Sequence, residues 1–323
     1  MNLKDLLHKI REFDGVKRKS DIGHIVEGFE EKEDFVIASF GEDAAVLDFG
    51  DDIILMSADG IWEKMIDADP YWAGYCSILV NIHDICAMGG TPLAMVNILA
   101  MKSKEFCMEA LKGMQDAIKK FKVPIVGGHL HPNTSYNSLG ITIVGRAEKD
   151  SVIYSHTANV GEDVVVGVDL NGRIYPTCSL CWDSVTLKDG ETLKRQMESM
   201  RILGRRKLVT AGKDLSNPGM LGTLGMLLEV SGVGAIVDIN DIPIPDGLEM
   251  EQWLKMYPGM GFVVTCKKKD TAEVIAVFKD HLLDAKRIGE IIEERKLIVQ
   301  DGEEKEVLFD FEKGGITGIK AKK

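Results

Sequence analysis

The clearest pattern of apolar and polar positions lies in the first third of the chain. Residues 53–56 form an apolar run with strand character, and Asp59-Gly60 follows shortly after it, where a sharp turn can begin. Asp69-Pro70 then supplies the residue types preferred at a helix N-cap and first position, and Gly89-Gly90 is typical of a helix end. The pattern predicts a strand, a turn and a helix of about five turns.

The predicted helix carries polar residues within an apolar sequence. Ser77, Asn81, Asp84 and Met88 recur at i, i+4, i+7 and i+11, so they share one face. A buried amide and a buried carboxylate must find partners. Hydrogen bonds to nearby backbone would satisfy them, and so would a metal ion held between Asp84 and Asp59. The residues alone leave both interpretations open.

The rest of the chain alternates helical and strand patterns. In the first half we expect a helix within residues 1–31, a strand at 93–101, an amphipathic helix at 103–121 and a strand at 138–148. In the second half we expect a strand at 163–168, a helix at 191–211, a second helix that ends at Glu229 and a strand after Gly259. Residues 270–323 predict a helix followed by short strands, and no chemistry is evident in them. This alternation predicts an α/β (α+β) protein.

Length and charge narrow the possible functions. The chain has 323 residues, which suggests two domains, and we place them at residues 1–150 and 151–323. The net charge of −12 argues against binding to nucleic acid or to an anionic membrane. No apolar stretch is long enough to cross a membrane and no signal peptide is evident, so we expect a cytoplasmic protein with reduced cysteines.

Several familiar motifs are absent from the sequence. There is no P-loop, no dinucleotide-binding glycine fingerprint, no nucleophile elbow and no His-Glu-x-x-His motif. Any nucleotide site in this chain must therefore be of the kind in which carboxylates hold Mg²⁺ on the phosphates.

Three stretches carry a resemblance to a known family. The chain resembles the aminoimidazole ribonucleotide (AIR) synthase superfamily in Asp59-Gly60, in the Asn-x-x-Asp of residues 81–84 and in the Met-Gly-Gly-Thr-Pro of residues 88–92. This superfamily includes thiamine-monophosphate kinase, selenophosphate synthetase, formylglycinamidine ribonucleotide synthase and a hydrogenase-maturation protein. The chain is most similar to the AIR synthase-related proteins known as methanogenesis marker 2. The resemblance implies an N-terminal mixed-sheet domain that pairs in a homodimer, a C-terminal α/β domain, and ATP and Mg²⁺ as cofactors.

The resemblance also implies a set of metal ligands. Residues 41–47 resemble the family's Gly-Asp-Asp-Ala-Ala-Val element, with Glu42 in place of the first Asp, so the metal role passes to Asp43. Asp59 and Asp84 match further ligands, and Asp214 matches an Asp of the second family signature. Two carboxylates 4 Å apart repel by roughly 4 kcal/mol in a protein-like dielectric. Such a cluster favours a hard cation such as Mg²⁺.

Other residues match the nucleotide-binding and catalytic positions. We expect Asn81 and Gly127-Gly128 to contact the nucleotide, and His129 to contact it and to orient the transferred group. Lys64 follows Asp59 at a spacing found in AIR synthase and is a candidate for contact with a phosphate, although a solvated lysine explains it equally well. The basic run at residues 17–20 is either a solvated turn or a flexible lid over phosphates.

The leading hypothesis is an ATP- and Mg²⁺-dependent phosphoryl-transfer enzyme, of the kinase, ligase or dehydratase type. Its acceptor would be a small molecule or a protein-bound carbonyl or amide group, in a process linked to methanogenesis. The alternative is an ATP-binding maturation or assembly factor with little catalysis of its own. A third hypothesis is a zinc or redox protein that uses His129, His131 or the Cys178/Cys181 pair, with His83 as a further zinc ligand. For the cysteine pair itself, two free thiols are the simplest interpretation.

Overall fold

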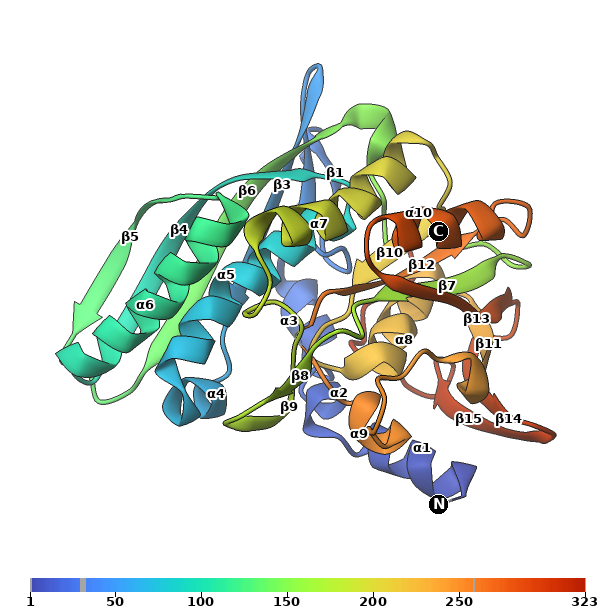
Figure 1. Cartoon of the computed structure of the whole chain (residues 1–323). Helices are drawn as coiled ribbons and strands as arrows, with labels where there is room; N and C mark the ends of the chain where they lie inside the picture. Colours follow the sequence, from blue (N-terminus) through green and yellow to red (C-terminus); the bar gives the residue numbers. More distant parts are fainter. Residues whose placement is uncertain (1, 30–32, 258, 323) are drawn as a thin grey trace.

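The computed structural model describes residues 2–29, 33–257 and 259–322. The described residues build two large sheets, one from each half of the chain, with helices packed on both, and a small two-stranded sheet of β8 and β9 (Figure 1). Within the described residues, no helix is long and apolar enough to cross a membrane.

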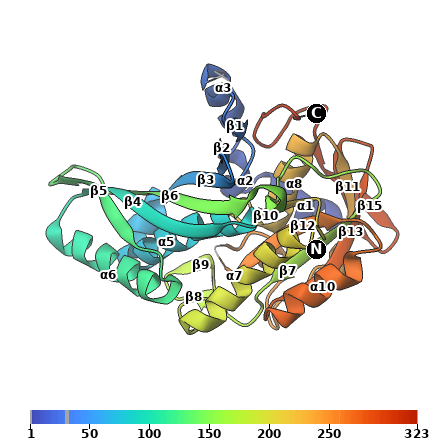
Figure 2. The same ribbon diagram turned by 90° about the horizontal axis from the view of Figure 1, so that it is seen from above.

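The N-terminal sheet has six strands in the order β1-β2-β3-β6-β4-β5. All neighbours are antiparallel except the parallel pair β4 and β5. Helices α5 and α6 cover one face of this sheet, and the other face is left open (Figure 2). The bounds are β1 Val36–Ala38, β2 Ala45–Phe49, β3 Asp52–Gly60, β4 Thr91–Met101, β5 Ile125–Pro132, β6 Ser138–Glu148, α4 Glu63–Ala68, α5 Pro70–Ala87 and α6 Lys104–Phe121.

The strand-turn-helix unit predicted from the sequence is confirmed. β3 ends at Gly60, and α5 begins at Pro70 with the Asp69 side chain accepting a hydrogen bond from the Trp72 backbone N–H at 2.9 Å. Gly89 adopts a left-handed conformation with φ of 74° just after the helix, a conformation that glycine reaches without steric cost. Local capping therefore fixes both ends of α5.

The C-terminal sheet has seven strands in the order β10-β12-β7-β13-β11-β14-β15. Helices α7 and α10 pack on the side facing the N-terminal domain, and α8 packs on the other side. The bounds are η2 Lys149–Ser151, β7 Asp163–Val168, β8 Arg173–Tyr175, β9 Cys178–Asp183, α7 Gly190–Arg205, β10 Ala211–Asp214, α8 Gly219–Ser231, β11 Gly234–Asp238, η3 Ile239–Asp241, α9 Met250–Trp253, β12 Gly261–Cys266, α10 Thr271–Asp280, β13 Asp284–Ile292, β14 Lys296–Asp301 and β15 Glu304–Asp310.

Helix α1, at the N-terminus, packs with the C-terminal sheet and not with the N-terminal sheet. α1 (Leu3–Arg11) buries its apolar face in the same core as α8, and the Arg11 guanidinium donates to the Val307 carbonyl of β15 at 2.8 Å. The short helices α2 (Asp14–Lys17) and α3 (Ile22–Val26) and the turn η1 (Glu27–Phe29) lead back to the N-terminal sheet. The expectation that residues 1–150 form one unit is therefore wrong for α1.

The helix predicted at residues 191–211 is shorter than expected. α7 ends at Arg205, because Lys207 adopts a left-handed conformation and the Leu208 backbone N–H turns back to the Leu203 carbonyl at 3.1 Å. This is a helix-ending motif that needs no glycine. The chain then enters β10, whose last residue is Asp214.

Candidate active site

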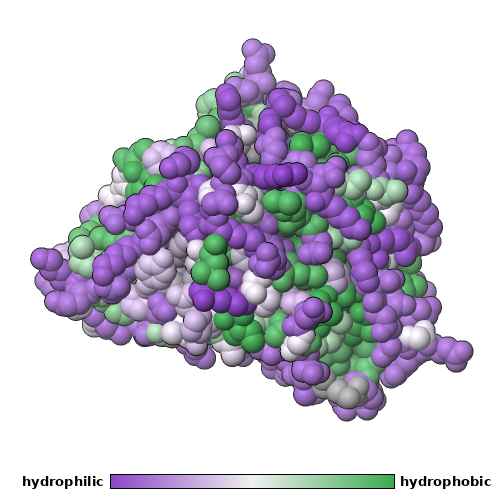
Figure 3. Space-filling view, viewed as in Figure 1, coloured by the Kyte–Doolittle hydropathy of each residue, from purple (hydrophilic) through white to green (hydrophobic). Residues whose placement is uncertain are grey.

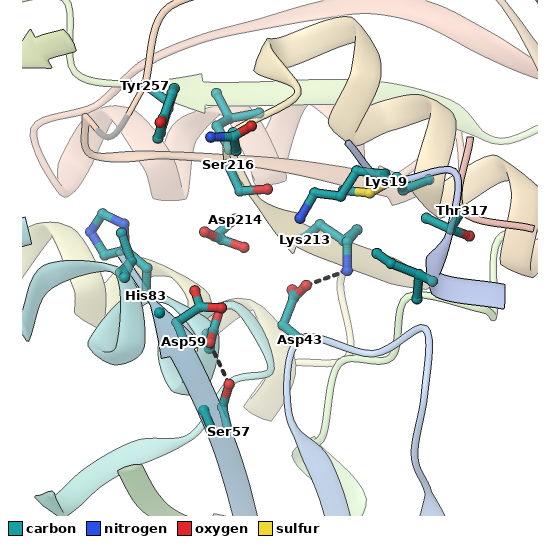
Figure 4. A pocket seen from close by; sticks show the side chains of 18 of the residues that line it. Lys19, Asp43, Ser57, Asp59, His83, Lys213, Asp214, Ser216, Tyr257 and Thr317 are labelled. Atoms are coloured by element: carbon teal, nitrogen blue, oxygen red, sulfur yellow. Dashed lines mark hydrogen bonds and ion pairs between the residues drawn. The ribbon is translucent and has the colours of Figure 1, made fainter. Parts of the chain in front are cut away.

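A cavity of about 330 Å³ lies between the two domains (Figure 4). The four aspartates predicted as metal ligands, Asp43, Asp59, Asp84 and Asp214, all line it. Asp43 lies on the turn before β2, Asp59 near the end of β3, Asp84 on α5 and Asp214 at the end of β10. Strand ends and one helix face thus converge from both halves of the chain. We call this the aspartate cavity.

The polar face of α5 is only partly satisfied by hydrogen bonds. The Asn81 amide donates to the Ser77 carbonyl at 2.9 Å, while its Oδ1 has no hydrogen-bond partner within the described residues. The Ser57 hydroxyl of β3 donates to the Asp84 carboxylate. The Ala44 backbone N–H contacts the Met88 sulfur at 3.1 Å. This face therefore ties α5 to the β2 and β3 edge of the cavity.

Lys213 is the main site residue for which the sequence suggested no role. Its buried ammonium pairs with the Asp43 carboxylate and lies 3.4 Å from the Ser155 hydroxyl. Asp43 Oδ2 accepts no hydrogen bond of normal geometry from the described residues, although the Asp214 backbone N–H is near enough to oppose the rise of the Asp43 pKa. The one available signal was the position of Lys213 directly before Asp214 on a strand.

The surroundings disfavour ionised carboxylates in the aspartate cavity. Burial raises the pKa of Asp84 and of Asp214 well above the usual range, and the neighbouring carboxylates add to this rise. Burial also raises the pKa of Asp43, against the opposing charge of Lys213. Asp59 is exposed to solvent within the cavity, yet the protein around it raises its pKa despite Lys19 and Lys213. A bound cation would relieve this repulsion.

The residues fit a magnesium site that a ligand completes. Within the described ranges, no three His, Cys, Asp or Glu side chains lie close enough together to hold a metal ion by themselves. Four aspartates nevertheless line one cavity, and Asp43 keeps an oxygen without a normal hydrogen bond. An all-oxygen donor set suits Mg²⁺, which is commonly bound by one or two carboxylates together with substrate phosphates.

The basic segment before α3 contributes to the cavity. Arg18 and Lys19 line it, and Figure 4 shows the Lys19 side chain extending into it. Burial lowers the pKa of Lys19, and the nearby Asp59 opposes that shift. Lys17, in contrast, is exposed and pairs with Glu12. Of the two interpretations left open, a basic cover over the cavity describes Arg18 and Lys19 better than a solvated turn.

Glu42 has a partner set of its own. Its fully buried carboxylate accepts a hydrogen bond from the Ser155 backbone N–H at 2.6 Å, pairs with His156, and lies 3.4 Å from the Lys322 ammonium. Burial by itself would raise the pKa of Glu42, but these partners outweigh it and hold the pKa below its usual value. Glu42 thus fastens the interdomain connection and the C-terminal segment beside the cavity.

The C-terminal segment also reaches the aspartate cavity. Thr317 and Ile319 line it. Residues 270–323, in which the sequence shows no evident chemistry, thus supply part of the cavity wall. Nothing in that segment's composition signals this role, because only the return of the chain past α8 brings it to the cavity.

Three predicted residues lie on an edge strand away from the cavity. Gly127, Gly128 and His129 are exposed on β5, three strand spacings or about 14 Å from β3. Ile98 pairs with His129, so both side chains point to the open face of the sheet, opposite α5 and α6. Within one chain, the structure does not bring these residues to the aspartate cavity.

Two further candidates occupy separate positions. Asn81 is fully buried in α5. Lys64 lines a neighbouring groove, where its ammonium lies 4.9 Å from the centre of the Trp62 ring.

The histidines do not form one cluster. His129 and His131 are neighbours, with ring centres 4.5 Å apart, but His83 lies in the wall of the aspartate cavity. His83 is almost fully buried and its Nε2 has no partner within the described residues. Burial lowers its pKa to about 4, so the ring is neutral at pH 7. The zinc set that combined it with His129 and His131 is not assembled.

The Cys-x-x-Cys pair differs from the simplest expectation. Cys178 and Cys181 are joined by a disulfide, so the expectation of two free thiols is wrong. The other four cysteines of the chain are free, and Cys178 lines the same groove as Lys64.

Family models match both halves of the chain. The model described as AIR synthase related protein, N-terminal domain, matches residues 41–147, and the one for the C-terminal domain matches residues 155–302. The chain is 47% identical to an uncharacterised protein of Methanocaldococcus jannaschii over 98% of this chain and 100% of that protein.

Two named relatives are more distant. Identity is 25% to the selenide, water dikinase of Carboxydothermus hydrogenoformans, over 68% of this chain and 64% of that protein. It is 24% to the phosphoribosylformylglycinamidine cyclo-ligase of Pyrococcus furiosus, over 81% of this chain and 86% of that protein.

Solved structures share the fold. PurL of Thermotoga maritima complexed with ATP superposes with a TM-score of 0.76 at 19% identity, over 99% of this chain and 55% of that chain. The chain therefore spans about half the length of PurL. AaThiL complexed with AMPPCP and TMP superposes with a TM-score of 0.67 at 19% identity, over 96% of this chain and 99% of that chain. The predicted two-domain α/β fold is confirmed.

Proposed function

Because the chain belongs to the AIR synthase related family, we propose that it is an ATP- and Mg²⁺-dependent phosphoryl-transfer enzyme. Its relatives include a dikinase and a cyclo-ligase, and structures of the same fold hold ATP or AMPPCP. The acceptor is an unidentified small molecule or a protein-bound carbonyl or amide group. The observation that carries the proposal is the convergence of four aspartates and two lysines on one interdomain cavity.

Each group in the cavity has a role under this proposal. Asp43, Asp59, Asp84 and Asp214 would hold Mg²⁺, which neutralises charge on the transferred phosphoryl group when it is bound. Lys19 and Lys213 would donate hydrogen bonds to phosphate oxygens. Lys213 has a competing partner in Asp43, so nucleotide binding would redistribute an ion pair that the protein already holds.

The open face of the N-terminal sheet supports the proposal of a homodimer. Met56 on β3 and Val96 and Ile98 on β4 are between 42% and 59% exposed on that face. The outer face of α6, at the left of Figure 3, is largely hydrophilic by comparison. Several exposed apolar side chains on one face of a sheet favour a partner surface. His129 shares this face, so any role of His129 in catalysis would be exerted across the dimer interface.

A maturation or assembly factor remains the second candidate. The observation that favours it is Glu42, which stands where the family motif has an Asp. Glu42 lines the cavity, but its carboxylate is engaged by His156, Ser155 and Lys322. Tight ATP binding without turnover, together with a co-purifying protein, would favour this candidate. A cytoplasmic location and a link to methanogenesis belong to either proposal.

The first test follows nucleotide products from ATP and Mg²⁺ with purified protein. We expect slow wild-type turnover that falls at least tenfold in Asp59→Asn and further in Asp59→Asn with Asp84→Asn, because carboxylates that position the cation are lost. Asp52→Asn is the matched control, since Asp52 lies at the other end of the same strand and is exposed. Turnover that survives in the double variant would refute the mechanism.

A further inference from the structure

A second cavity adjoins the aspartate cavity and shares part of its wall. This groove has a volume of about 720 Å³ and runs between α1, α2, α4 and the start of β9. Five residues line both spaces: Arg18, Trp62, Met65, Asn217 and Tyr257. A phosphoryl donor and its acceptor must meet, so the acceptor is expected next to the aspartate cavity. The groove is the adjoining space, and its size suits a small molecule.

The centre of the groove carries two cations beside one aromatic ring. The Arg18 guanidinium lies 5.0 Å and the Lys64 ammonium 4.9 Å from the centre of the Trp62 ring. In the part of the chain that the structure describes, neither cation forms an ion pair with a carboxylate. Two cations around one indole form a site for an anion attached to a planar or apolar body.

The carboxylates that line the groove are mostly engaged elsewhere. Glu251 pairs with Lys9 and Lys255, and Glu12 pairs with Lys17. The Asp69 carboxylate caps α5 and accepts a hydrogen bond from the Thr177 hydroxyl at 3.0 Å. Of the carboxylates that line the groove, only that of Asp14 has no ion pair or hydrogen bond with the described residues. Among the described residues that line the groove, the Arg18 and Lys64 cations therefore remain available to a ligand, together with the Asp14 carboxylate, whose repulsion would favour an anion held at the Trp62 end.

The wall shared with the aspartate cavity holds an unused polar atom. Asn217 Oδ1 is buried and has no hydrogen-bond partner within the described residues, although Asn217 lines both spaces. A buried acceptor without a partner costs free energy. A hydroxyl or N–H donor on a bound molecule would satisfy it at the point where the two spaces meet.

We propose that this groove is the acceptor site, and that the acceptor is a small molecule with a carboxylate or phosphate group. The anionic group lies between Arg18 and Lys64, the body of the molecule packs on Trp62, and its reacting end reaches Asn217 at the aspartate cavity. That the bound molecule accepts a phosphoryl group rests on the proposed function. The anion-binding site itself does not depend on ATP chemistry.

The test measures binding of two simple anions by saturation-transfer NMR without ATP. Phenyl phosphate and benzoate each join a ring to one of the two anionic groups, and benzyl alcohol is the uncharged control. We expect at least one anion to bind, with a Kd that rises at least tenfold in Lys64→Met, and benzyl alcohol to bind more weakly. The anion that binds with the lower Kd shows whether the natural ligand carries a phosphate or a carboxylate. Lys64 is exposed, so its replacement should not disturb folding.

Lys305→Met is the matched control, because Lys305 is exposed on β15 in the C-terminal sheet. The proposal is overturned if neither anion binds, or if binding is equal in Lys64→Met, Lys305→Met and wild type. If the anions do not bind but the protein turns over ATP, the acceptor site is refuted and the proposed function is not. If anion binding depends on Lys64 but the protein does not turn over ATP, the anion site in the groove is supported and the proposed phosphoryl-transfer function is refuted.

Discussion

At the residue scale, the aspartate cavity places function and stability in opposition. Burial raises the pKa of Asp84, and the neighbouring carboxylates of Asp59, Asp214 and Asp43 raise it further. A carboxyl whose pKa is raised by folding weakens the folded state once it ionises. This loss begins as pH rises through the unfolded-state pKa near 3.9 and is complete above the raised folded-state pKa. Under the proposed function, the same carboxylates hold a cation, and binding of that cation would offset the cost.

Asp84→Asn should therefore stabilise the protein when no divalent cation is present. The Ser57 hydroxyl can still donate to the new amide oxygen, while the repulsion is removed. We expect the Tm at pH 7 to rise by at least about 2 °C in chelator, which is on the order of 1 kcal/mol for domains of this size. The gain should shrink as pH falls toward 4. A lower Tm for the variant in chelator would contradict this account.

The sequence identified Asp43, Asp59, Asp84 and Asp214, and all four line the cavity. It did not identify Lys213 or His83 as cavity residues, and it left Lys19 open between a solvated turn and a lid over phosphates. A lysine on a strand is usually solvated, so nothing local reveals that Lys213 is buried against Asp43. Ion pairs between residues 170 positions apart are decided by tertiary packing alone.

At the element scale, α5 is held close to α6 by two glycines. A Cβ on Gly74 would lie 2.0 Å from the Ala110 carbonyl oxygen, and one on Gly113 would lie 1.9 Å from the Tyr71 carbonyl oxygen. The contact atoms are backbone, so they cannot rotate away. This close approach positions the helix that carries Asp84 against the sheet.

Gly113→Ala should destabilise the protein by about 1–3 kcal/mol, because α5 and α6 must separate to admit a methyl group. Denaturant unfolding would measure the change. Gly314→Ala serves as the matched control, since a Cβ there meets nothing within 4 Å, and it should alter stability by less than about 0.5 kcal/mol. Equal effects of the two substitutions would show that the helix contact is looser than described.

The elements themselves were predicted with uneven success. α5 was correctly bounded because Asp69, Pro70 and Gly89 act locally. α7 was extended too far, because residues 206–211 contain no glycine or proline to signal that the helix ends at Arg205.

At the scale of the whole molecule, the open face of the N-terminal sheet should determine the oligomeric state. Ile98→Lys places a charge at the centre of the apolar face and should convert a dimer into a monomer, measured by light scattering after size-exclusion chromatography. Leu187→Lys is the control, because Leu187 is 74% exposed in a loop of the C-terminal domain. A monomeric wild type, or a dimeric Ile98→Lys, would refute the proposed interface.

The sequence by itself determined the local elements and the positions where carboxylates occur at strand ends and on one helix face. Those features depend on capping, turns and periodicity, which act over a few residues. Tertiary structure alone decided that α1 packs on the C-terminal core, that Lys213 neutralises Asp43, that Thr317 reaches the cavity and that His129 faces away from it. These outcomes depend on which distant segments exclude water from one another, and no short stretch of sequence encodes that choice.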